Sequence, residues 1–294
     1  MYYRRKILLS LLQTFNEAID KVSFQHLLFL LSTMQKEKLF HFIPSKVGCF
    51  SFQAEADLKT LTKYKQVESS GNYWKKTDNY DYVDELSAQD KAALKTLKEQ
   101  YGSFEKDELI AYTHRQYPYL AINSTMAESL STAEENEMIK NLMTSHETSV
   151  LFTIGYEGIT LEEYLNKLID SDVKVLCDVR KNPMSMKFGF NKKQLQTACN
   201  EVNIEYIHIP EVGIDANIRK EFSNQTDHQE LLEIYKSNIL PTVTHKQKEI
   251  LLLVKNKKRI ALTCYEADLN QCHRKPLAES ISKLPDFNFE LKHL

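Results

Sequence analysis

The sequence predicts an α/β protein. Its C-terminal half is expected to form a doubly wound parallel sheet, a Rossmann-like arrangement of three layers, preceded by a mostly helical winged-helix-like domain. From about residue 151, short apolar runs alternate with helical stretches, and this order builds right-handed crossovers and a parallel sheet. Before residue 77, three helical patterns precede two short strands, which is the order of a winged-helix domain. A chain of 294 residues is also long enough for two separate cores.

The domain boundaries are expected where the composition changes. We assign residues 1–125 to the helical domain, residues 126–149 to a linker and residues 150–294 to the α/β domain. The linker is rich in Ser, Thr and Glu and has few large apolar residues, so it offers little to a core. A helical pattern covers only residues 133–142 of it.

In the first domain, apolar residues at helical spacing predict a helix over residues 4–19. Ser23 and Ser51 are candidate N-caps of a second and a third helix. The segment KQVESSGNYWKKT predicts two strands joined at residues 70–72. Its YWKK residues could form a wing that touches a nucleic-acid backbone, or an aromatic hairpin packed on its own helices. A pair of helices is expected to follow, at residues 87–101 and 104–117.

In the second domain, five apolar runs are the candidate strands: VLFTIG, VKVLCDV, IEYIHI, RIALTC and FNFELK. Several are apolar on both faces, as expected when helices cover both sides of a parallel sheet. Helical stretches are predicted to begin near Leu161, Asn191, His228 and Arg274.

Charge and cysteine usage narrow the classes of partner and compartment. Residues 1–77 carry 12 basic against 6 acidic residues, and residues 78–150 carry 6 against 14. The first segment is therefore the candidate for binding an anionic partner. Five scattered cysteines favour a reducing cytoplasm over a disulfide framework. No apolar run approaches the roughly 18 residues that a membrane span needs, so no membrane partner is expected.

Polar and reactive residues follow the predicted strands of the second domain. Because parallel strands end at one edge of a sheet, where ligands of such folds bind, we expect these residues to line one pocket. The candidate catalytic residues are Asp178, Cys264, Glu266, Cys272 and His273. The candidate substrate-binding residues are Gly155, Tyr156, Arg180, His208 and Arg274.

Each proposed role follows from side-chain chemistry. Arg180 and Arg274 would hold a phosphate or carboxylate, and Arg274 would lie where a helix N-terminus already favours an anion. Cys264 or Cys272, beside cationic groups, would act as the nucleophile. His273 would serve as acid or base, with Asp178 or Glu266 as its carboxylate partner.

Simpler interpretations stay open for the same residues. Asp178 and Arg180 could form a salt bridge that only orders a loop, His208 could be a core histidine, and both Cys264 and Cys272 could be structural. No metal is expected, because a zinc site would lack a fourth ligand and adjacent Cys and His rarely bind one ion. No cofactor is expected either.

Two family resemblances are carried by ordered segments. TIGYEG, CDVRKNPMSMKFGFNKKQL, IEYIHIPEVG and CYEADLNQCHRKPLAESI resemble the domain of unknown function 488 family over residues 151–294. That resemblance marks residues 178–180 and 264–274 as a signature. GCFSFQAEADLKTLTKY and LKEQYGSFEKDELIAYTHRQYPY, within residues 1–125, resemble the Panacea (SocA-like) antitoxin-type domain, which implies binding of a partner protein.

These observations favour an enzyme, a hydrolase or transferase that acts on a phosphorylated, nucleotide-like or nucleic-acid substrate. The N-terminal module would recruit nucleic acid or a protein partner, in a prokaryotic conflict or defence system. One alternative is a non-catalytic sensor of an anion or nucleotide. Another is a nucleic-acid-binding regulatory protein whose basic first segment makes the contact.

Overall fold

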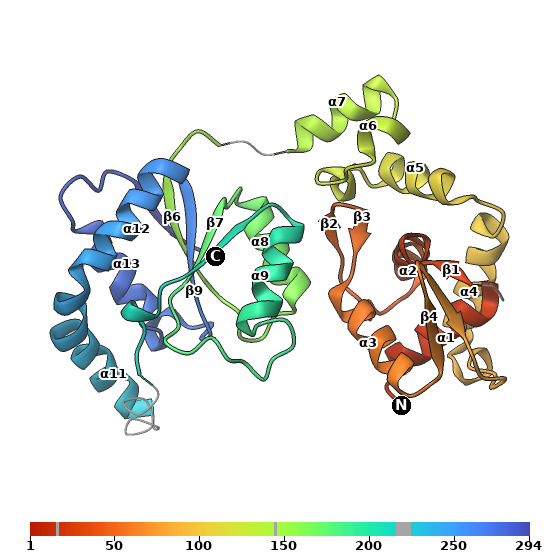
Figure 1. Ribbon diagram of the computed structural model, residues 1–294, viewed down its shortest axis with the longest axis horizontal. Coiled ribbons are helices and arrows are strands. Elements are labelled where there is room, and N and C mark those ends of the chain that lie inside the picture. Colours follow the sequence, from red (N-terminus) through yellow and green to blue (C-terminus); the bar gives the residue numbers. More distant parts are fainter. Residues whose placement is uncertain (16–17, 144–145, 216–224) are drawn as a thin grey trace. The chain divides into compact units, whose positions relative to one another are not determined.

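The structure is a computed structural model that describes residues 1–15, 18–143, 146–215 and 225–294. The chain divides into two compact units, Met1–Met143 and Thr144–Leu294. Figure 1 shows the first unit in red to yellow-green and the second in green to blue. Each unit has its own core of buried apolar side chains.

The second unit contains a five-stranded sheet of order β10-β6-β9-β7-β8, in which every neighbouring pair is parallel. The predicted parallel sheet is therefore confirmed. Each of the five apolar runs supplies one strand, and the last run supplies the edge strand beside β6. The strands are β6 Val150–Gly155, β7 Val175–Asp178, β8 Glu205–His208, β9 Arg259–Cys264 and β10 Glu290–His293.

Helices cover both faces of this sheet, with α8 and α9 on one side and α12 and α13 on the other (Figure 1). On the first face, the Tyr164 hydroxyl of α8 donates to Thr263 of β9 at 2.7 Å. On the second face, Ile250 of α12 and Leu277 of α13 pack with apolar residues of β7 and β9. The helices are α8 Leu161–Asp170, α9 Lys192–Glu201, α11 Gln225–Ile234, α12 Thr244–Lys257 and α13 Arg274–Ser282.

Local sequence explains where these helices begin. Thr160 and Glu163 form a capping box at the start of α8, and the Asn191 side chain accepts a hydrogen bond from the Gln194 amide at the start of α9. The stretch expected to begin near His228 is two helices. A π-helical turn, Tyr235–Ile239, and a 3₁₀ turn, Leu240–Val243, separate α11 from α12.

The first unit is mostly helical. Ser51 caps α3, as predicted. The cap of α2 is Asp20, three residues before the predicted Ser23. Its longer helices are α1 Tyr3–Phe15, α2 Lys21–Met34, α3 Phe52–Lys63, α4 Ala88–Tyr101 and α5 Lys106–Gln116. Short helices α6 Ala127–Leu130 and α7 Ala133–Leu142 follow, and short 3₁₀ turns occupy Val83–Glu85 and Pro118–Ala121.

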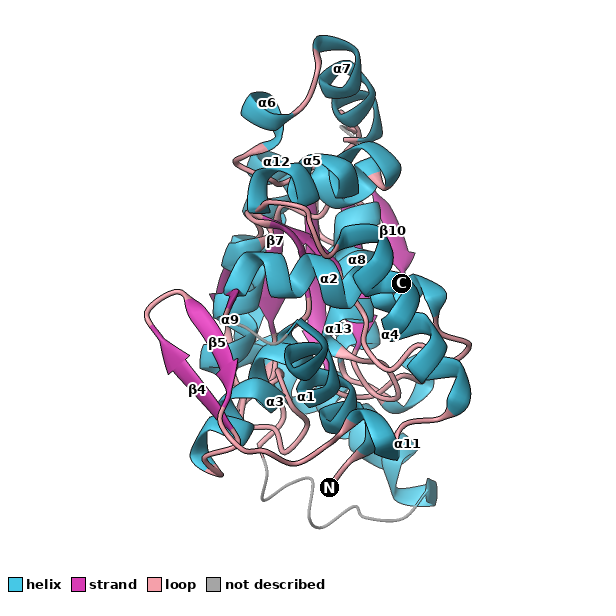
Figure 2. Cartoon of the chain, turned by 90° about the vertical axis from the view of Figure 1, so that its right-hand side faces the viewer, coloured by secondary structure: helices cyan, strands magenta, loops and turns pink. Residues whose placement is uncertain are grey.

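Five short strands complete the described part of this unit. The predicted hairpin is β4 and β5, and β1 pairs with β5, giving the antiparallel order β1-β5-β4. Figure 2 shows the β4–β5 hairpin projecting beside α1 and α3. Its Trp74 is only 2% exposed, so this aromatic ring belongs to the core. The strands are β1 Ile19–Asp20, β2 Ile43–Ser45, β3 Gly48–Phe50, β4 Val67–Ser70 and β5 Tyr73–Lys76.

The segment assigned to a linker contains ordered helices within residues 126–143. Ala127 of α6 and Ile139 of α7 are buried against Ala121. A Thr132–Glu135 capping box begins α7, as the helical pattern over residues 133–142 suggested. Among the described residues, no helix is both long and apolar enough to cross a membrane.

Candidate functional site

The order of the sheet places the carboxyl ends of β6, β9 and β7, which carry candidate site residues, next to one another. Strand β9 lies between β6 and β7, with Gly155 paired with Cys264 and Asp178 paired with Thr263. The loop after β9 leads to Cys272 and His273 at the start of α13. The carboxyl edge therefore carries two groups of side chains, one around Asp178 and one around Cys264.

Asp178 and Arg180 form a buried ion pair. Asp178 is 0% exposed and Arg180 is 6% exposed. One carboxylate oxygen accepts from Arg180 Nε at 2.8 Å, and the other accepts from Nη2. Burial alone would lower the pKa of Arg180, but hydrogen bonding and the charge of Asp178 raise it above its ordinary value. This pair is a fixed element of the edge and favours the salt-bridge interpretation.

Further buried groups hold the pair in place. Arg180 Nη1 donates to the Tyr156 hydroxyl at 2.6 Å and to the Phe190 carbonyl at 2.8 Å. The Tyr206 hydroxyl donates to Asp178 Oδ2 at 2.6 Å. Burial and the charge of Asp178 raise the pKa of Tyr206, so this phenol stays protonated. Four of the five guanidinium N–H groups can be assigned to these partners, so Arg180 presents little to a substrate.

Tyr206 and Phe190 were not among the candidate residues. Alternation along β8 places Tyr206 and His208 on the same face, and His208 lies beside Asp178 in the register. That alternation is the signal that could have identified Tyr206. Phe190 contributes a backbone carbonyl to Arg180 and stacks its ring on Tyr156 at 4.2 Å, and no side-chain pattern foretells either contact.

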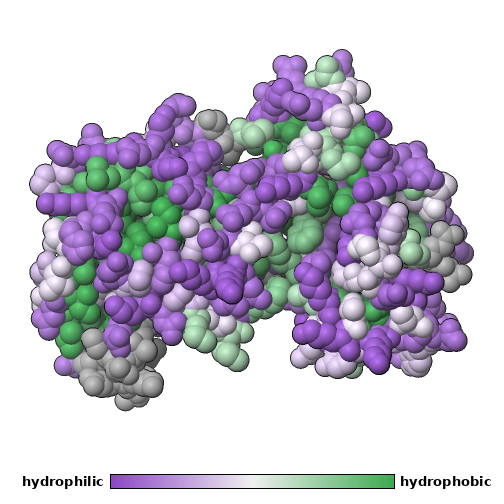
Figure 3. Space-filling model, viewed as in Figure 1, coloured by the Kyte–Doolittle hydropathy of each residue, from purple (hydrophilic) through white to green (hydrophobic). Residues whose placement is uncertain are grey.

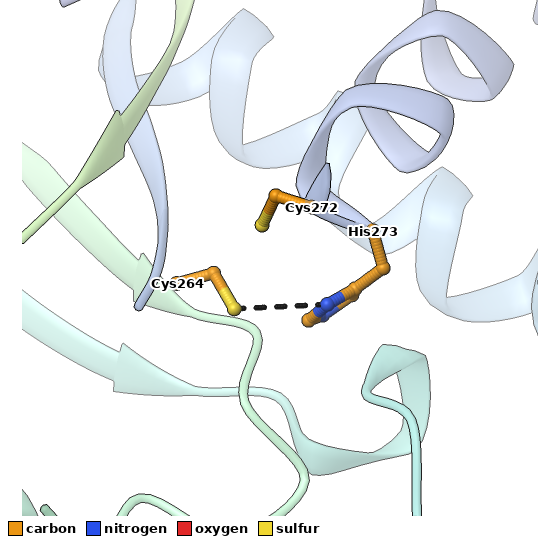
Figure 4. A group of neighbouring side chains, drawn as sticks. All are labelled: Cys264, Cys272 and His273. Carbon is orange, nitrogen blue, oxygen red and sulfur yellow. Dashed lines mark hydrogen bonds between the residues drawn. The ribbon is translucent and has the colours of Figure 1, made fainter. Parts of the chain in front are cut away.

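Cys264, Cys272 and His273 form the second group, which we call the cysteine–histidine cluster. Figure 4 shows the three side chains pointing toward one another from the end of β9 and the start of α13. Cys264 Sγ lies 3.6 Å from His273 Nδ1, and one ligand atom from each of the three residues lies within 4.8 Å of the others. All three residues are at most 1% exposed.

Two neighbours orient this cluster. His273 Nε2 lies 3.1 Å from the Val179 carbonyl oxygen. Since a carbonyl can only accept, Nε2 carries the proton, and in the neutral ring Nδ1 is then an acceptor that faces Cys264. The single thiol proton of Cys264 has two acceptors within reach, Glu266 Oε2 at 3.0 Å and His273 Nδ1 at 3.6 Å. Val179 lies between Asp178 and Arg180 in sequence, so its carbonyl joins the two groups of the edge.

Burial raises the pKa of three cysteines of this domain. Burial raises the pKa of Cys272 well above its usual value, and hydrogen bonding to Cys264 adds to the effect. Burial likewise raises the pKa of Cys177 to about 12 and also raises that of Cys199. Cys177 and Cys199 pack in the core, as their positions in an apolar strand and on a helix predicted.

Arg274 lies at this edge but is 1% exposed. Its Nη1 donates to the Glu266 carbonyl, and its Nη2 donates to the Ala267 carbonyl at 3.1 Å. Its Nε is buried and has no hydrogen-bond partner among the described residues. The Arg274 side chain therefore holds the loop after β9 through two hydrogen bonds, and its buried Nε–H is a donor without a partner among the described residues.

Gly155, Tyr156 and His208 occupy fixed positions. A Cβ at Gly155 would lie 2.0 Å from the Glu266 carbonyl oxygen, so this glycine permits a close backbone approach. Tyr156 contacts Arg180 through its hydroxyl. His208 Nε2 donates to the Arg180 carbonyl at 2.9 Å, and Lys192 Nζ lies 3.2 Å from its Nδ1.

The loop after β7 carries exposed apolar side chains and lysines. Met184 and Met186 are 79% and 103% exposed, and Phe188 is also exposed. Figure 3 shows pale green, apolar atoms at the lower edge of the second unit, where this loop lies in Figure 1. Lys181 at the start of the loop is exposed, and Lys187 Nζ donates to the Tyr156 carbonyl at 2.6 Å.

A separate cavity of about 430 Å³ lies away from this edge, and the sequence analysis did not anticipate it. Its lining includes Lys236, Pro241, Gln247, Glu279, Ser280 and Lys283.

The fold of the second unit and the residues at the carboxyl edge of its sheet define a class: α/β proteins with a buried cysteine–histidine group at the ends of parallel strands. Residues 160–281 match the model of a family described as "Domain of unknown function DUF488". The matched span includes Asp178, Arg180 and the cysteine–histidine cluster, in agreement with the resemblance noted for the C-terminal half. It excludes residues 1–159, so the Panacea-like resemblance stays a prediction. No curated protein and no solved structure matched the chain.

Proposed function

We propose that the C-terminal domain is a thiol-dependent hydrolase or transferase, with Cys264 as its nucleophile and His273 as its base. The observation that carries this proposal is the chain of contacts from Cys264 Sγ through His273 to the Val179 carbonyl. A nucleophile, a base within reach of it and a third group that orients the base are the parts that activated thiols require. The tautomer fixed by Val179 leaves His273 Nδ1 ready to take the proton of the thiol.

The substrate in this proposal is anionic: a phosphorylated compound, a nucleotide or a nucleic acid. Lys181 and Lys192 are exposed at the same edge, and the buried Nε of Arg274 is a donor that a substrate oxygen could satisfy. Arg180 has a positioning role, because it is held by Asp178 and Tyr156. Asp178 likewise acts through Arg180, and Glu266 is the carboxylate next to the nucleophile.

Alkylation tests the nucleophile directly. Wild-type protein is treated with iodoacetamide between pH 6 and 8, and the modified peptides are quantified by mass spectrometry. We expect Cys264 to react before Cys199, and His273→Ala to slow alkylation of Cys264 at least tenfold, because the base that withdraws the thiol proton is lost. Equal rates at Cys264 and Cys199, or no effect of His273→Ala, would remove the proposed nucleophile.

We further propose that the first unit is a winged-helix-like, Panacea-like module of a cytoplasmic conflict or defence protein that recruits nucleic acid or a protein partner. The element order α1, β1, α2, α3 and the β4–β5 hairpin supports this assignment. Basic residues on α3 support a nucleic-acid contact, since Lys59 and Lys63 are exposed, although Lys59 also pairs with Glu55 at 3.2 Å. Arg4 and Arg5 contribute less, because both donate to the buried Asp57 carboxylate.

A gel-shift salt titration of the full chain with a DNA duplex separates the two kinds of partner. If nucleic acid binds through α3, Lys59→Ala and Lys63→Ala should weaken binding and each reduce the slope of log K against log salt by about 1. Lys95→Ala, on the exposed surface of α4, is the matched control. No shift at low salt would exclude duplex DNA and leave a protein partner as the remaining proposal.

A further inference from the structure

The cysteine–histidine cluster offers three soft ligand atoms to one point. Cys264 Sγ, Cys272 Sγ and a ring nitrogen of His273 all lie within 4.8 Å of one another (Figure 4). We infer that these three atoms bind a single transition-metal ion, with Zn²⁺ as the best match. Thiolate and imidazole are the ligands that zinc takes in proteins. The inference goes beyond the proposed function, because it concerns what the cluster holds and not what the domain turns over.

The spacing of the ligand atoms suits a tetrahedral ion. Zinc–sulfur and zinc–nitrogen bonds of roughly 2.3 and 2.1 Å at tetrahedral angles place the ligand atoms about 3.5–3.8 Å apart. Cys264 Sγ and His273 Nδ1 lie 3.6 Å apart. The adjacency of Cys272 and His273 in sequence argued against a shared ion, yet their ligand atoms and that of Cys264 all lie within 4.8 Å of one another. The ring approaches through Nδ1, the nitrogen nearer the backbone.

The surroundings of His273 are those of a metal ligand. Histidines that bind metal commonly donate their other ring N–H to a carbonyl or carboxylate, which fixes the tautomer and the ring plane. The Val179 carbonyl lies 3.1 Å from His273 Nε2 and serves in this way. Tyr235 packs edge-on against the same ring, with centroids 5.4 Å apart, and further restricts its rotation.

Charge balance favours the ion at this depth. Binding releases two protons: two thiols and Zn²⁺ give a zinc dithiolate and two H⁺. Two thiolates, a neutral imidazole and a divalent cation sum to zero net charge, so with water as the fourth ligand the loaded cluster buries no net charge. An isolated thiolate at this depth is unfavourable, whereas a thiolate paired with a cation is stabilised.

The fourth coordination position has candidates beside the cluster. Glu266 Oε2 lies 3.0 Å from Cys264 Sγ and could complete the shell, and a water molecule would otherwise take that place. Whichever group completes the shell, a bound ion occupies the sulfur that the proposed function assigns as nucleophile. Metal binding would then block alkylation of Cys264, so the thiol chemistry belongs to the metal-free form.

Cobalt binding tests the inference on the full-length protein. Protein treated with reductant and chelator is titrated with Co²⁺. We expect thiolate-to-cobalt charge-transfer absorption together with the intense visible bands of tetrahedral Co²⁺, saturating at one ion per chain and abolished by added Zn²⁺. Cys272→Ser should reduce affinity for Co²⁺ at least tenfold while leaving the contact between Cys264 and His273 in place. Cys199→Ser, at another buried cysteine, is the matched control and should bind as wild type does.

Three outcomes would overturn the inference: no charge-transfer band in the wild-type protein, an unchanged titration in Cys272→Ser, or an equal loss in Cys199→Ser. Circular dichroism establishes that each variant is folded, and the wild-type titration stands without any variant. The alkylation test of the proposed function is run on metal-free protein. Failure of the nucleophile and failure of the metal site are thus separate results.

Discussion

Arg180 and Arg274 are buried at the same sheet edge, but their guanidinium groups meet different partners. Arg180 meets a carboxylate, a hydroxyl and a carbonyl. Arg274 meets two loop carbonyls, and its Nε has no partner in the part of the chain that the structure describes. Side-chain type alone predicted the same anion-binding role for both. Their burial and partners differ: the Arg180 guanidinium is held in an ion pair, whereas the buried Nε of Arg274 has no hydrogen-bond partner among the described residues.

At Arg180, removal of the side chain should be costly. Arg180→Ala would leave Asp178, which is 0% exposed, without its counter-ion. Breaking a buried ion pair from one side typically costs about 3–5 kcal/mol of unfolding free energy, and we expect a loss of that order. The measurement is urea unfolding followed by far-UV circular dichroism. Lys181→Ala, the exposed neighbour, should change stability by no more than about 0.5 kcal/mol. A loss below about 1 kcal/mol for Arg180→Ala would show that the pair contributes little.

Two buried histidines should make the first unit acid-sensitive. His26 and His114 are 0% and 1% exposed, their ring centroids lie 6.1 Å apart, and burial lowers the pKa of each from 6.5 to about 4. The unfolded chain binds protons at these sites at higher pH than the folded chain does. Stability is therefore full above about pH 6.5 and falls between pH 6.5 and 4, by up to about 3 kcal/mol per histidine.

The measurement is urea unfolding of this unit at several pH values within that window. His114→Phe keeps an aromatic ring and removes one titrating group, so its stability should fall about half as steeply with decreasing pH. An unchanged pH dependence in His114→Phe would show that the histidines are not its source. Carboxylates with lowered pKa values, such as Asp90, lose their contribution only at lower pH.

At the scale of elements, apolar patterning predicted the parallel sheet because its central strands β6, β7 and β9 are buried on both faces. Strand β9 is buried at all six positions. Its sequence, RIALTC, is mostly apolar without alternation, which is the pattern that predicts such a strand. Strand β1 and the β2–β3 hairpin were missed, because two- and three-residue strands carry no period. The convergence of Cys264 and His273 followed from parallel strand ends. The partners Val179 and Phe190 act through backbone carbonyls, which sequence patterns do not encode.

The end of β6 depends on a glycine. A Cβ at Gly155 would approach the Glu266 carbonyl to 2.0 Å, and backbone atoms cannot yield as a flexible side chain can. Gly155→Ala should therefore displace the loop after β9 and cost about 2 kcal/mol or more in unfolding free energy. Thermal and urea unfolding measure this cost. At Gly158, where φ is +80° and no atom lies within 4 Å of a Cβ, alanine should cost only about 1–2 kcal/mol of backbone strain. A cost at Gly155 that does not exceed the cost at Gly158 would contradict the close-approach argument.

For the whole molecule, the separate cores have a measurable consequence. The chain has one tryptophan, Trp74, which is 2% exposed in the core of the first unit. Its fluorescence therefore reports unfolding of residues 1–143, whereas circular dichroism reports both units. Arg180 belongs to the second unit. We expect urea unfolding in two transitions, since chains with two domains depart from a single cooperative transition.

Arg180→Ala should then move one transition only. The midpoint followed by tryptophan fluorescence should stay at its wild-type value, because no contact of Trp74's core is altered. In the circular dichroism curve, the transition of the α/β unit should move to a lower urea concentration, and the other transition should stay in place. Lys181→Ala should leave both signals unchanged. A parallel shift of fluorescence and circular dichroism in Arg180→Ala would mean that the two cores unfold as one cooperative unit, and it would contradict their independence.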